Sequence, residues 1–163
     1  MIVEAAHPET GEIFSIDIPS LQTHDLDRMA KEYTTDVKIK SYIEKLPVSA
    51  EIKALLFKLS KFTIKVGETL IKFGKKILEI AMMLAAKYQH ATLGLILGAL
   101  LTFLIGAIPV LGPPLASFLG SLLMLFGLAK GLWEDLKKDN PQLAASVVSS
   151  GEIFMPLSTK AAT

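Results

Sequence analysis

Histidines, cysteines and paired carboxylates are the side chains that most often carry catalysis or bind metals, and this sequence has few of them in useful patterns. The three histidines are His7, His24 and His90, and no second histidine lies within a helical turn of any of them. His24 precedes Asp25 and Asp27 without the spacing of an H-E-x-x-H metal motif. This pattern favours solvent-facing side chains over a metal site.

Other residue sets that mark common enzyme sites are also missing from the sequence. It contains no cysteine, which excludes disulfides, thiolate nucleophiles and cysteine-ligated metal clusters. No G-x-x-x-x-G-K-[S/T] phosphate loop and no G-x-S-x-G nucleophile motif occurs. We therefore predict that the protein is not an enzyme and holds no cofactor or metal.

Lysine is the chemically active side chain whose spacing is regular. Between Glu51 and Glu79 charged residues recur every seven positions, and a second row follows three or four positions behind. On one helix over 49–87 the two rows would lie about 40° apart and form a single polar strip. The lysines of this strip are Lys58, Lys61, Lys65, Lys72 and Lys75.

A strip of ammonium groups attracts anions, and three arrangements fit it. The strip is the solvated face of a bundle helix, faces anionic lipid headgroups, or lines the water-filled lumen of an oligomer. In each arrangement residues 49–87 form one long basic amphipathic helix, which Ser49 begins as the capping residue.

A long uncharged block follows this helix. Residues 88–129 contain no Lys, Arg, Asp or Glu. As one helix the block would span about 63 Å, twice the apolar core of a bilayer. Prolines and a glycine interrupt it at a predicted turn, made of Pro109, Gly112, Pro113 and Pro114. Two arms of membrane length remain, over 88–108 and 113–133.

The ends of the two arms carry residues typical of a membrane interface. Lys87 and Tyr88 precede the first arm, and Lys130 and Trp133 close the second. These four residues are predicted interface anchors, and the basic pair at the base places both termini on the cytoplasmic side. Residues 88–133 are thus predicted to form a transmembrane or re-entrant helical hairpin.

Small residues recur at spacings that let helices approach closely. They predict helix packing, either between the two arms or between protomers, with a pore lined by hydroxyl groups as a further alternative. The predicted packing positions are Ser60, Gly67, Gly74, Gly94, Gly98, Gly106, Gly120, Gly127 and Gly131.

The terminal regions are more polar. Residues 1–48 carry nine acidic and five basic side chains. They predict a small α+β region with a β-hairpin over 2–18 and two short helices over 21–46, although residues 37–40 also alternate like a strand. Residues 134–163 form a tail in which 151–155 is a possible strand, because Gly-Glu-Ile-Phe occurs at both 11–14 and 151–154.

Overall charge argues against nucleic-acid binding. The net charge is +1, and Arg28 is the only arginine among 163 residues. Nucleic-acid interfaces are typically rich in arginine, so we predict no nucleic-acid partner.

Together these patterns predict a mainly α membrane protein. A long amphipathic helix precedes a proline-broken hydrophobic helical hairpin, and the small N-terminal region pairs with the C-terminal strand. The hairpin over Tyr88–Trp133, with Pro109, Pro113 and Pro114, resembles in architecture those of colicin-type pore-forming domains and of caveolin- or oleosin-like proteins. No sequence motif accompanies this resemblance.

Function is then predicted from the hairpin and the lysine strip. The leading hypothesis is a membrane-embedded homo-oligomer that forms a channel or permeabilises a bilayer, such as a toxin, defence effector or phage-encoded protein. The alternative is a structural or scaffolding membrane protein of a virion or organelle, whose residues 1–48 dock a protein partner. Both hypotheses place the protein in a membrane with the lipid bilayer as a partner.

Overall fold

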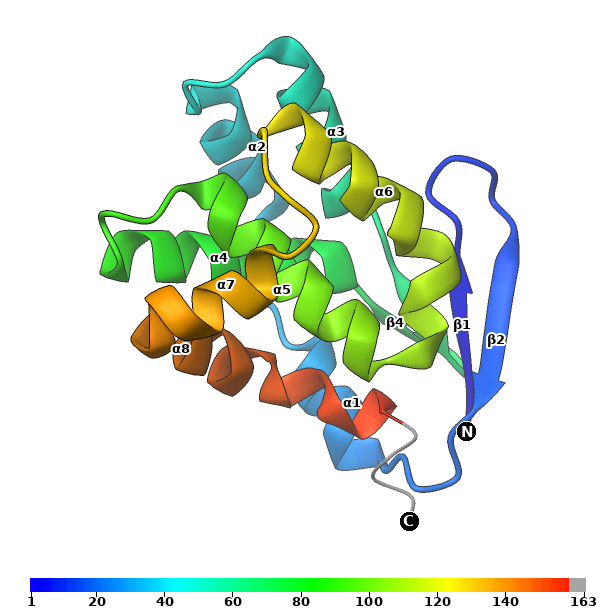
Figure 1. Ribbon diagram of the computed structural model, residues 1–163. Helices are drawn as coiled ribbons and strands as arrows, with labels where there is room; N and C mark the ends of the chain where they lie inside the picture. The colour runs from blue at the N-terminus through cyan, green and yellow to red at the C-terminus, as the bar shows by residue number, and fades with distance from the viewer. Residues whose placement is uncertain (159–163) are drawn as a thin grey trace.

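The computed structural model describes residues 1–158, which form a small antiparallel sheet and a set of helices around one central helix, α5 (Figure 1). The strands are β1 (Ile2–Ala6), β2 (Ile13–Asp17), β3 (Ile64–Val66) and β4 (Thr69–Ile71). The helices are α1 (Thr23–Ala30), α2 (Asp36–Lys45), α3 (Ala50–Ser60), α4 (Phe73–Lys87), α5 (Leu93–Ala107), α6 (Gly112–Leu125), α7 (Leu132–Asp139) and α8 (Pro141–Gly151). Two short 3-10 helices, η1 (Pro109–Leu111) and η2 (Glu152–Leu157), follow α5 and α8.

The sheet has the strand order β2-β1-β3-β4, with every neighbouring pair antiparallel. Val3 pairs with Ile16 and Val66, and its side chain is fully buried. Because side chains alternate between the two faces of a strand, the neighbouring positions face outward. Ile2, Ile13 and Leu70 accordingly remain 52%, 57% and 55% exposed. One face of the sheet therefore packs on the core and the other is open.

The predicted helix over 49–87 is wrong, because a β-hairpin divides it. α3 ends at Ser60, and the segments 64–66 and 69–71 alternate with a period of two, which suits a strand with one buried face. Gly67 is the first of the two residues that join β3 to β4, and its φ of +59° is the backbone conformation that turns of this length require. The lysine strip is therefore distributed over α3, β3 and α4.

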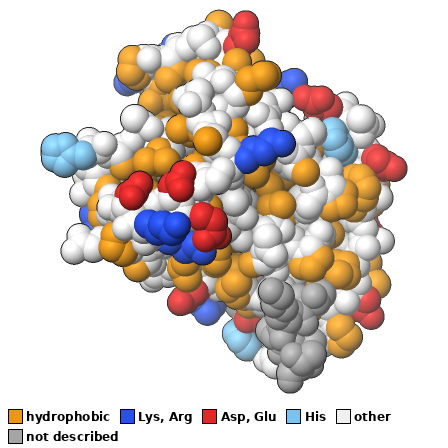
Figure 2. All heavy atoms as spheres, in the orientation of Figure 1, with side chains coloured by type: hydrophobic (Ala, Val, Ile, Leu, Met, Phe, Trp, Pro, Cys, Tyr) orange, Lys and Arg blue, Asp and Glu red, His pale blue; other side chains and the backbone are white. Residues whose placement is uncertain are grey.

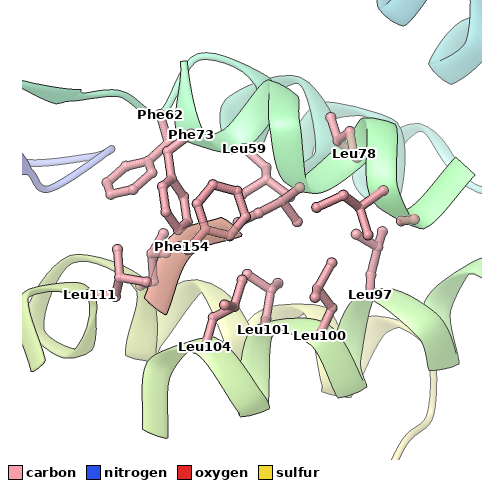
Figure 3. Close-up of a cluster of buried hydrophobic side chains, with 14 of the residues drawn as sticks. Leu59, Phe62, Phe73, Leu78, Leu97, Leu100, Leu101, Leu104, Leu111 and Phe154 are labelled. Carbon is pink, nitrogen blue, oxygen red and sulfur yellow. The ribbon is translucent and has the colours of Figure 1, made fainter. Parts of the chain in front are cut away.

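The core is built around α5, which packs against α4, α6, α7 and α8. Leu97, Leu100, Leu101 and Leu104 of this helix are fully buried. Figure 3 shows them facing side chains of α3 and α4, with Phe154 of η2 inserted beside them.

Aromatic rings join the C-terminal segment to α4. The rings of Phe73 and Phe154 lie 4.3 Å apart, and Phe62 meets Phe73 edge-on at 6.1 Å. These contacts bury Phe73 and Phe154 completely.

The predicted fold class, a mainly α membrane protein with two spanning arms, is wrong. Within residues 1–158 no single helix is both long and apolar enough to cross a membrane; α5 and the segment Pro109–Leu125 meet that test only together, bent by 118°. α5 begins five residues later than the predicted arm because Thr92 caps it, its Oγ1 accepting the Leu95 N–H at 3.1 Å. The descriptions as a membrane, transmembrane or pore-forming protein consequently find no support in this fold.

The termini differ from the prediction in one respect. β1 and β2 form the hairpin over 2–18, and residues 37–40 belong to α2. The predicted strand over 151–155 is wrong, because these residues end α8 and form η2. Burial of Phe154 against Phe73 holds that segment in a helical turn rather than at the sheet. The last residues of the predicted tail, 159–163, lie outside the described part of the chain.

The surface around α5 and α7 combines both kinds of side chain. Figure 2 shows acidic and basic groups gathered over α7, beside hydrophobic side chains over α5 and α6. The charged groups of α7 are Glu134, Asp135, Lys137, Lys138 and Asp139.

Candidate anion-binding site

A cavity of about 460 Å³ lies where α2, α3 and the first turn of α4 meet. We call it the lysine cavity, because four of its lining residues are lysines and only one is a carboxylate. Its lining residues are Asp36, Ile39, Lys40, Phe57, Ser60, Lys61, Thr63, Lys72 and Lys75. Its volume lies within the range of about 300–1,000 Å³ that small-molecule sites occupy.

Close packing of α3 on α4 brings the lysines of this cavity together. A Cβ atom at Gly74 would lie 1.6 Å from the backbone oxygen of Leu59, so only glycine permits this approach. The Gly74 N–H donates to the carbonyl oxygen of Phe62 at 2.9 Å, which fixes the start of α4 beside the end of α3. Lys61 and Lys72 therefore reach the cavity from adjacent helix ends.

Two of the four lysines are bound to carboxylates. Lys75 Nζ lies 2.9 Å from Glu32 Oε1 and 2.8 Å from Asp36 Oδ1. Lys72 Nζ lies 3.1 Å from Glu32 Oε1 and 3.4 Å from Asp36 Oδ2. The Lys75 side chain is only 5% exposed, whereas both carboxylates face solvent.

These contacts shift the pKa values of all four groups toward the charged forms. Hydrogen bonds from Lys75 lower the pKa of Glu32 and of Asp36, with Lys72 adding to both effects. The hydrogen bond to Glu32 raises the pKa of Lys72. Burial disfavours the charged form of Lys75, but its hydrogen bonds to Asp36 and Glu32 together outweigh that effect and raise its pKa. All four groups are charged at neutral pH.

The other two lysines carry charge that the fold leaves uncompensated. Lys40 and Lys61 are exposed and form no ion pair within residues 1–158. The start of α4 adds partial positive charge, because its N-cap, Lys72, provides no side-chain cap and helix N-termini attract anions. Ile39 and Phe57 supply an apolar wall below these groups. The cavity is suited to an anion attached to an apolar body.

Residues 31–36, which we call the strap, cross α4 next to the cavity. The backbone N–H of Thr34 donates to Glu79 Oε1 at 3.1 Å. Lys76 Nζ donates to the carbonyl oxygen of Lys31 and lies 4.6 Å from the centre of the Tyr33 ring. Burial lowers the pKa of Lys76, which Glu79 partly opposes. The strap is thus held by the Lys72 and Lys75 ion pairs, by Lys76 and by Glu79.

Known protein families, curated proteins and solved structures give no match to this chain. We therefore infer the function from the geometry of the site.

The structure separates the five lysines predicted to share one strip. Lys61, Lys72 and Lys75 line the lysine cavity. Lys58 instead lies 3.4 Å from Glu9 in the turn of the N-terminal hairpin. Lys65 lies on the open face of the sheet, paired in register with Glu4 and Leu70.

Three charged residues of the site were missed in the sequence, namely Glu32, Asp36 and Lys40. They belong to residues 1–48, which the sequence offers only as a possible protein-docking region. One signal was present, because Thr35 is a helix cap whose Oγ1 accepts the Lys38 N–H at 3.2 Å. This cap places Asp36 and Lys40 one helical turn apart on α2, on the side that faces α4.

The glycines among the predicted helix-packing positions fall into three groups. Besides Gly74, a Cβ at Gly94 would lie 2.5 Å from the Phe126 ring and one at Gly98 would lie 3.1 Å from Leu132. Gly67 and Gly127 have positive φ and serve turns. A Cβ would meet nothing within 4 Å at the third group, which is Gly106, Gly120 and Gly131. Ser60 lines the lysine cavity and donates its hydroxyl to Phe57 O at 2.6 Å.

The predicted turn residues lie at the starts of two helices in this fold. Pro109 begins η1, and Gly112, Pro113 and Pro114 form the first turn of α6.

Lys87 ends α4, and the Tyr88 hydroxyl lies 2.5 Å from Ser146 Oγ of α8. Trp133 packs on Phe103 with ring centres 5.7 Å apart, and Lys130 is exposed in the loop before α7.

The three histidines lie far apart in the chain, and each has a different environment. His7 Nδ1 accepts the backbone N–H groups of Glu9 and Thr10 at 3.1 and 3.2 Å, which closes the first hairpin turn. His24 lies 3.3 Å from Asp25, and His90 is exposed. In the described part of the chain no three His, Cys, Asp or Glu side chains are grouped to hold a metal ion.

Proposed function

We propose that this protein binds an organic anion, a carboxylate or a phosphate monoester carried on an apolar body, in the lysine cavity. One observation carries the proposal. Lys40 and Lys61, which have no acidic partner within residues 1–158, line the same cavity as the apolar wall of Ile39 and Phe57. Both ammonium groups are exposed, and a hydrogen bond from a charged donor to a carboxylate or phosphate oxygen is stronger than one between neutral groups, although salt screens part of the attraction.

The chemistry of the lysines supports binding. The raised pKa values of Lys72 and Lys75 keep both groups protonated at neutral pH, so neither offers a free amine for nucleophilic attack. A protonated lysine donates up to three hydrogen bonds and accepts none, which matches an anionic headgroup. The predictions that the protein is not an enzyme, and that it has a protein partner at residues 1–48 or self-associates, stay predictions.

Calorimetric titration with decyl phosphate and decanoate tests this proposal, with decan-1-ol and inorganic phosphate as comparison ligands. We expect both alkyl anions to bind more tightly than the neutral alcohol or the bare phosphate, and the affinity to fall as salt is added.

A double variant locates the binding. Lys40→Gln with Lys61→Gln removes the two uncompensated charges, and we expect about a tenfold or greater loss of affinity from two charge-assisted contacts. The matched control is Lys130→Gln with Lys138→Gln, which removes two exposed charges outside the cavity. The proposal is overturned if wild-type protein binds neither alkyl anion, or if the two double variants lose affinity equally.

A further inference from the structure

The strap occupies the surface of α4 between the lysine cavity and a second hollow. This apolar hollow has a volume of about 380 Å³. Its lining residues are Tyr33, Thr34, Lys76, Glu79, Ile80, Met83, Ser150 and Ile153. Smaller hollows under the strap share Glu32, Lys72 and Lys75 with the lysine cavity or with each other.

The two hollows lie along one face of α4. Lys72, Lys75, Glu79 and Met83 succeed one another at spacings of three or four residues, which places them on one side of the helix. From Lys72 to Met83 the rise is about 16 Å at 1.5 Å per residue. The charged end of this track is the lysine cavity, and the apolar end is the hollow beside Met83.

Another anion can replace the ion pairs that the strap makes with Lys72 and Lys75, whereas its contacts with Lys76 and Glu79 break when it opens. Glu32 and Asp36 are 48% and 70% exposed, so water solvates them when they leave the lysines. Lys75 is buried and requires an anionic partner in either state, because an unpaired buried charge is costly. Exchange of a protein carboxylate for a ligand carboxylate or phosphate keeps this lysine paired.

We propose that the strap is a lid that a single-chain alkyl or acyl anion displaces, a proposal that rests on the anion site proposed above. The headgroup stays in the lysine cavity beside Lys40 and Lys61, where it takes the places of Glu32 and Asp36 on Lys72 and Lys75. The chain begins at the wall of Ile39 and Phe57 and extends along α4 into the apolar hollow of Ile80, Met83 and Ile153. The empty protein is thus closed by its own acidic side chains, and its ligand is an amphiphile whose chain length contributes to affinity.

Neutralising the acids of the strap tests the exchange. In the variant Glu32→Gln with Asp36→Asn we expect amides 31–36 to exchange hydrogen faster without ligand. We also expect decyl phosphate to bind about three- to fivefold more tightly, the scale of one exposed ion pair. The matched control is Glu134→Gln with Asp135→Asn, which neutralises two acids in the first turn of α7. We expect wild-type affinity and wild-type exchange at the strap from this control.

Chain length tests the apolar end of the track. Wild-type protein should bind decyl phosphate more tightly than butyl phosphate, and Met83→Gln should reduce that preference while leaving butyl phosphate affinity unchanged. The control is Met124→Gln, which changes an even more exposed methionine of α6, outside the apolar hollow.

The outcomes separate the two proposals. If wild-type protein binds decyl phosphate but the strap variant shows unchanged affinity and exchange, the lid is wrong and the anion site stands. The same holds if decyl and butyl phosphate bind equally. If no alkyl anion binds, both proposals are overturned.

Discussion

Gly74 determines how closely α3 and α4 approach each other. It therefore also determines the distance between the cavity residues that these two helices contribute. A methyl group at this position would overlap the Leu59 backbone, which no side-chain movement can relieve. We expect Gly74→Ala to lower the free energy of unfolding by about 3 kcal/mol, the upper end of the cost of overpacking. Urea unfolding followed by circular dichroism measures this change.

The matched control lies on α6. A Cβ at Gly120 would meet nothing within 4 Å, so Gly120→Ala should stabilise the protein by about 0.5–1 kcal/mol through helix propensity alone. Equal effects of the two substitutions would contradict the close contact between α3 and α4.

The carboxyl groups of the strap give the protein a defined dependence on pH. Their pKa values are lowered from 4.5 for Glu32 and 3.8 for Asp36 by the adjacent lysines. A lowered pKa in the folded state means that the ion pairs stabilise the protein above these values and that this contribution is lost as pH falls through the lowered pKa.

We therefore expect the free energy of unfolding to decrease from pH 5 to pH 2.5, and to decrease less in Glu32→Gln with Asp36→Asn than in wild-type protein. Urea titrations at several pH values measure this. Neutralising Glu134 and Asp135 should leave the wild-type dependence largely intact, because neither contacts Lys72 or Lys75. Parallel curves for wild type and the strap variant would contradict the assigned ion pairs.

At the scale of elements, the turn between β3 and β4 determines the local topology. Gly67 adopts a φ of +59°, which costs other residues about 1 kcal/mol or more. We expect Gly67→Ala to destabilise the protein by about that amount in urea unfolding. Glu68→Ala, at the second turn position, should have a smaller effect. Equal effects would contradict a specific requirement for glycine at position 67.

Some elements could be predicted from short-range signals alone. The capping side chains of Thr35 and Ser49 each accept a backbone N–H three residues ahead, and helices α2 and α3 begin at these caps. The first hairpin follows from its turn residues and alternating strands. Such features involve neighbours in the sequence, so the sequence contains the information needed to find them.

The β3–β4 hairpin was harder to recognise, because two periodic patterns coincide. The charges from Lys58 to Lys72 keep a seven-residue spacing across the hairpin, which imitates a continuous helix. Ile64, Val66 and Ile71 have the β-branched character of a strand, but each segment has only three residues. Pairing of β3 with β1, about 60 residues earlier in the chain, decides the outcome, and no local pattern reveals that partner.

The candidate site shows the same limit. Lys61, Lys72 and Lys75 could be singled out from their spacing, whereas Glu32, Asp36 and Lys40 join them only through the packing of α2 on α3 and α4. The uncharged block was misassigned for a related reason. Its composition suits lipid or a protein interior equally, and the burial of α5 by four other helices distinguishes the two.

At the scale of the whole molecule, one core connects all the helices. Leu100 lies in the middle of α5 and is fully buried. We expect Leu100→Ala to lower the free energy of unfolding by about 2–5 kcal/mol. Because α4, α6, α7 and α8 all contact α5, the fluorescence of Trp133 and the far-ultraviolet circular dichroism should change together in one transition. Separate midpoints for the two signals would show that α7 unfolds independently of the rest.

The position of α5 in the chain also affects how the protein is made. Synthesis of α5 precedes that of α8 and η2, which cover it, by about 50 residues, or roughly 3–10 s at the usual rates of translation. During this interval an uncharged, leucine-rich helix can pack against α4 and then against α6 and α7 as they are made, but α8 does not yet cover it. The nascent chain is therefore prone to aggregation until Phe154 packs on Phe73. Until then it depends on factors at the ribosome that bind apolar segments.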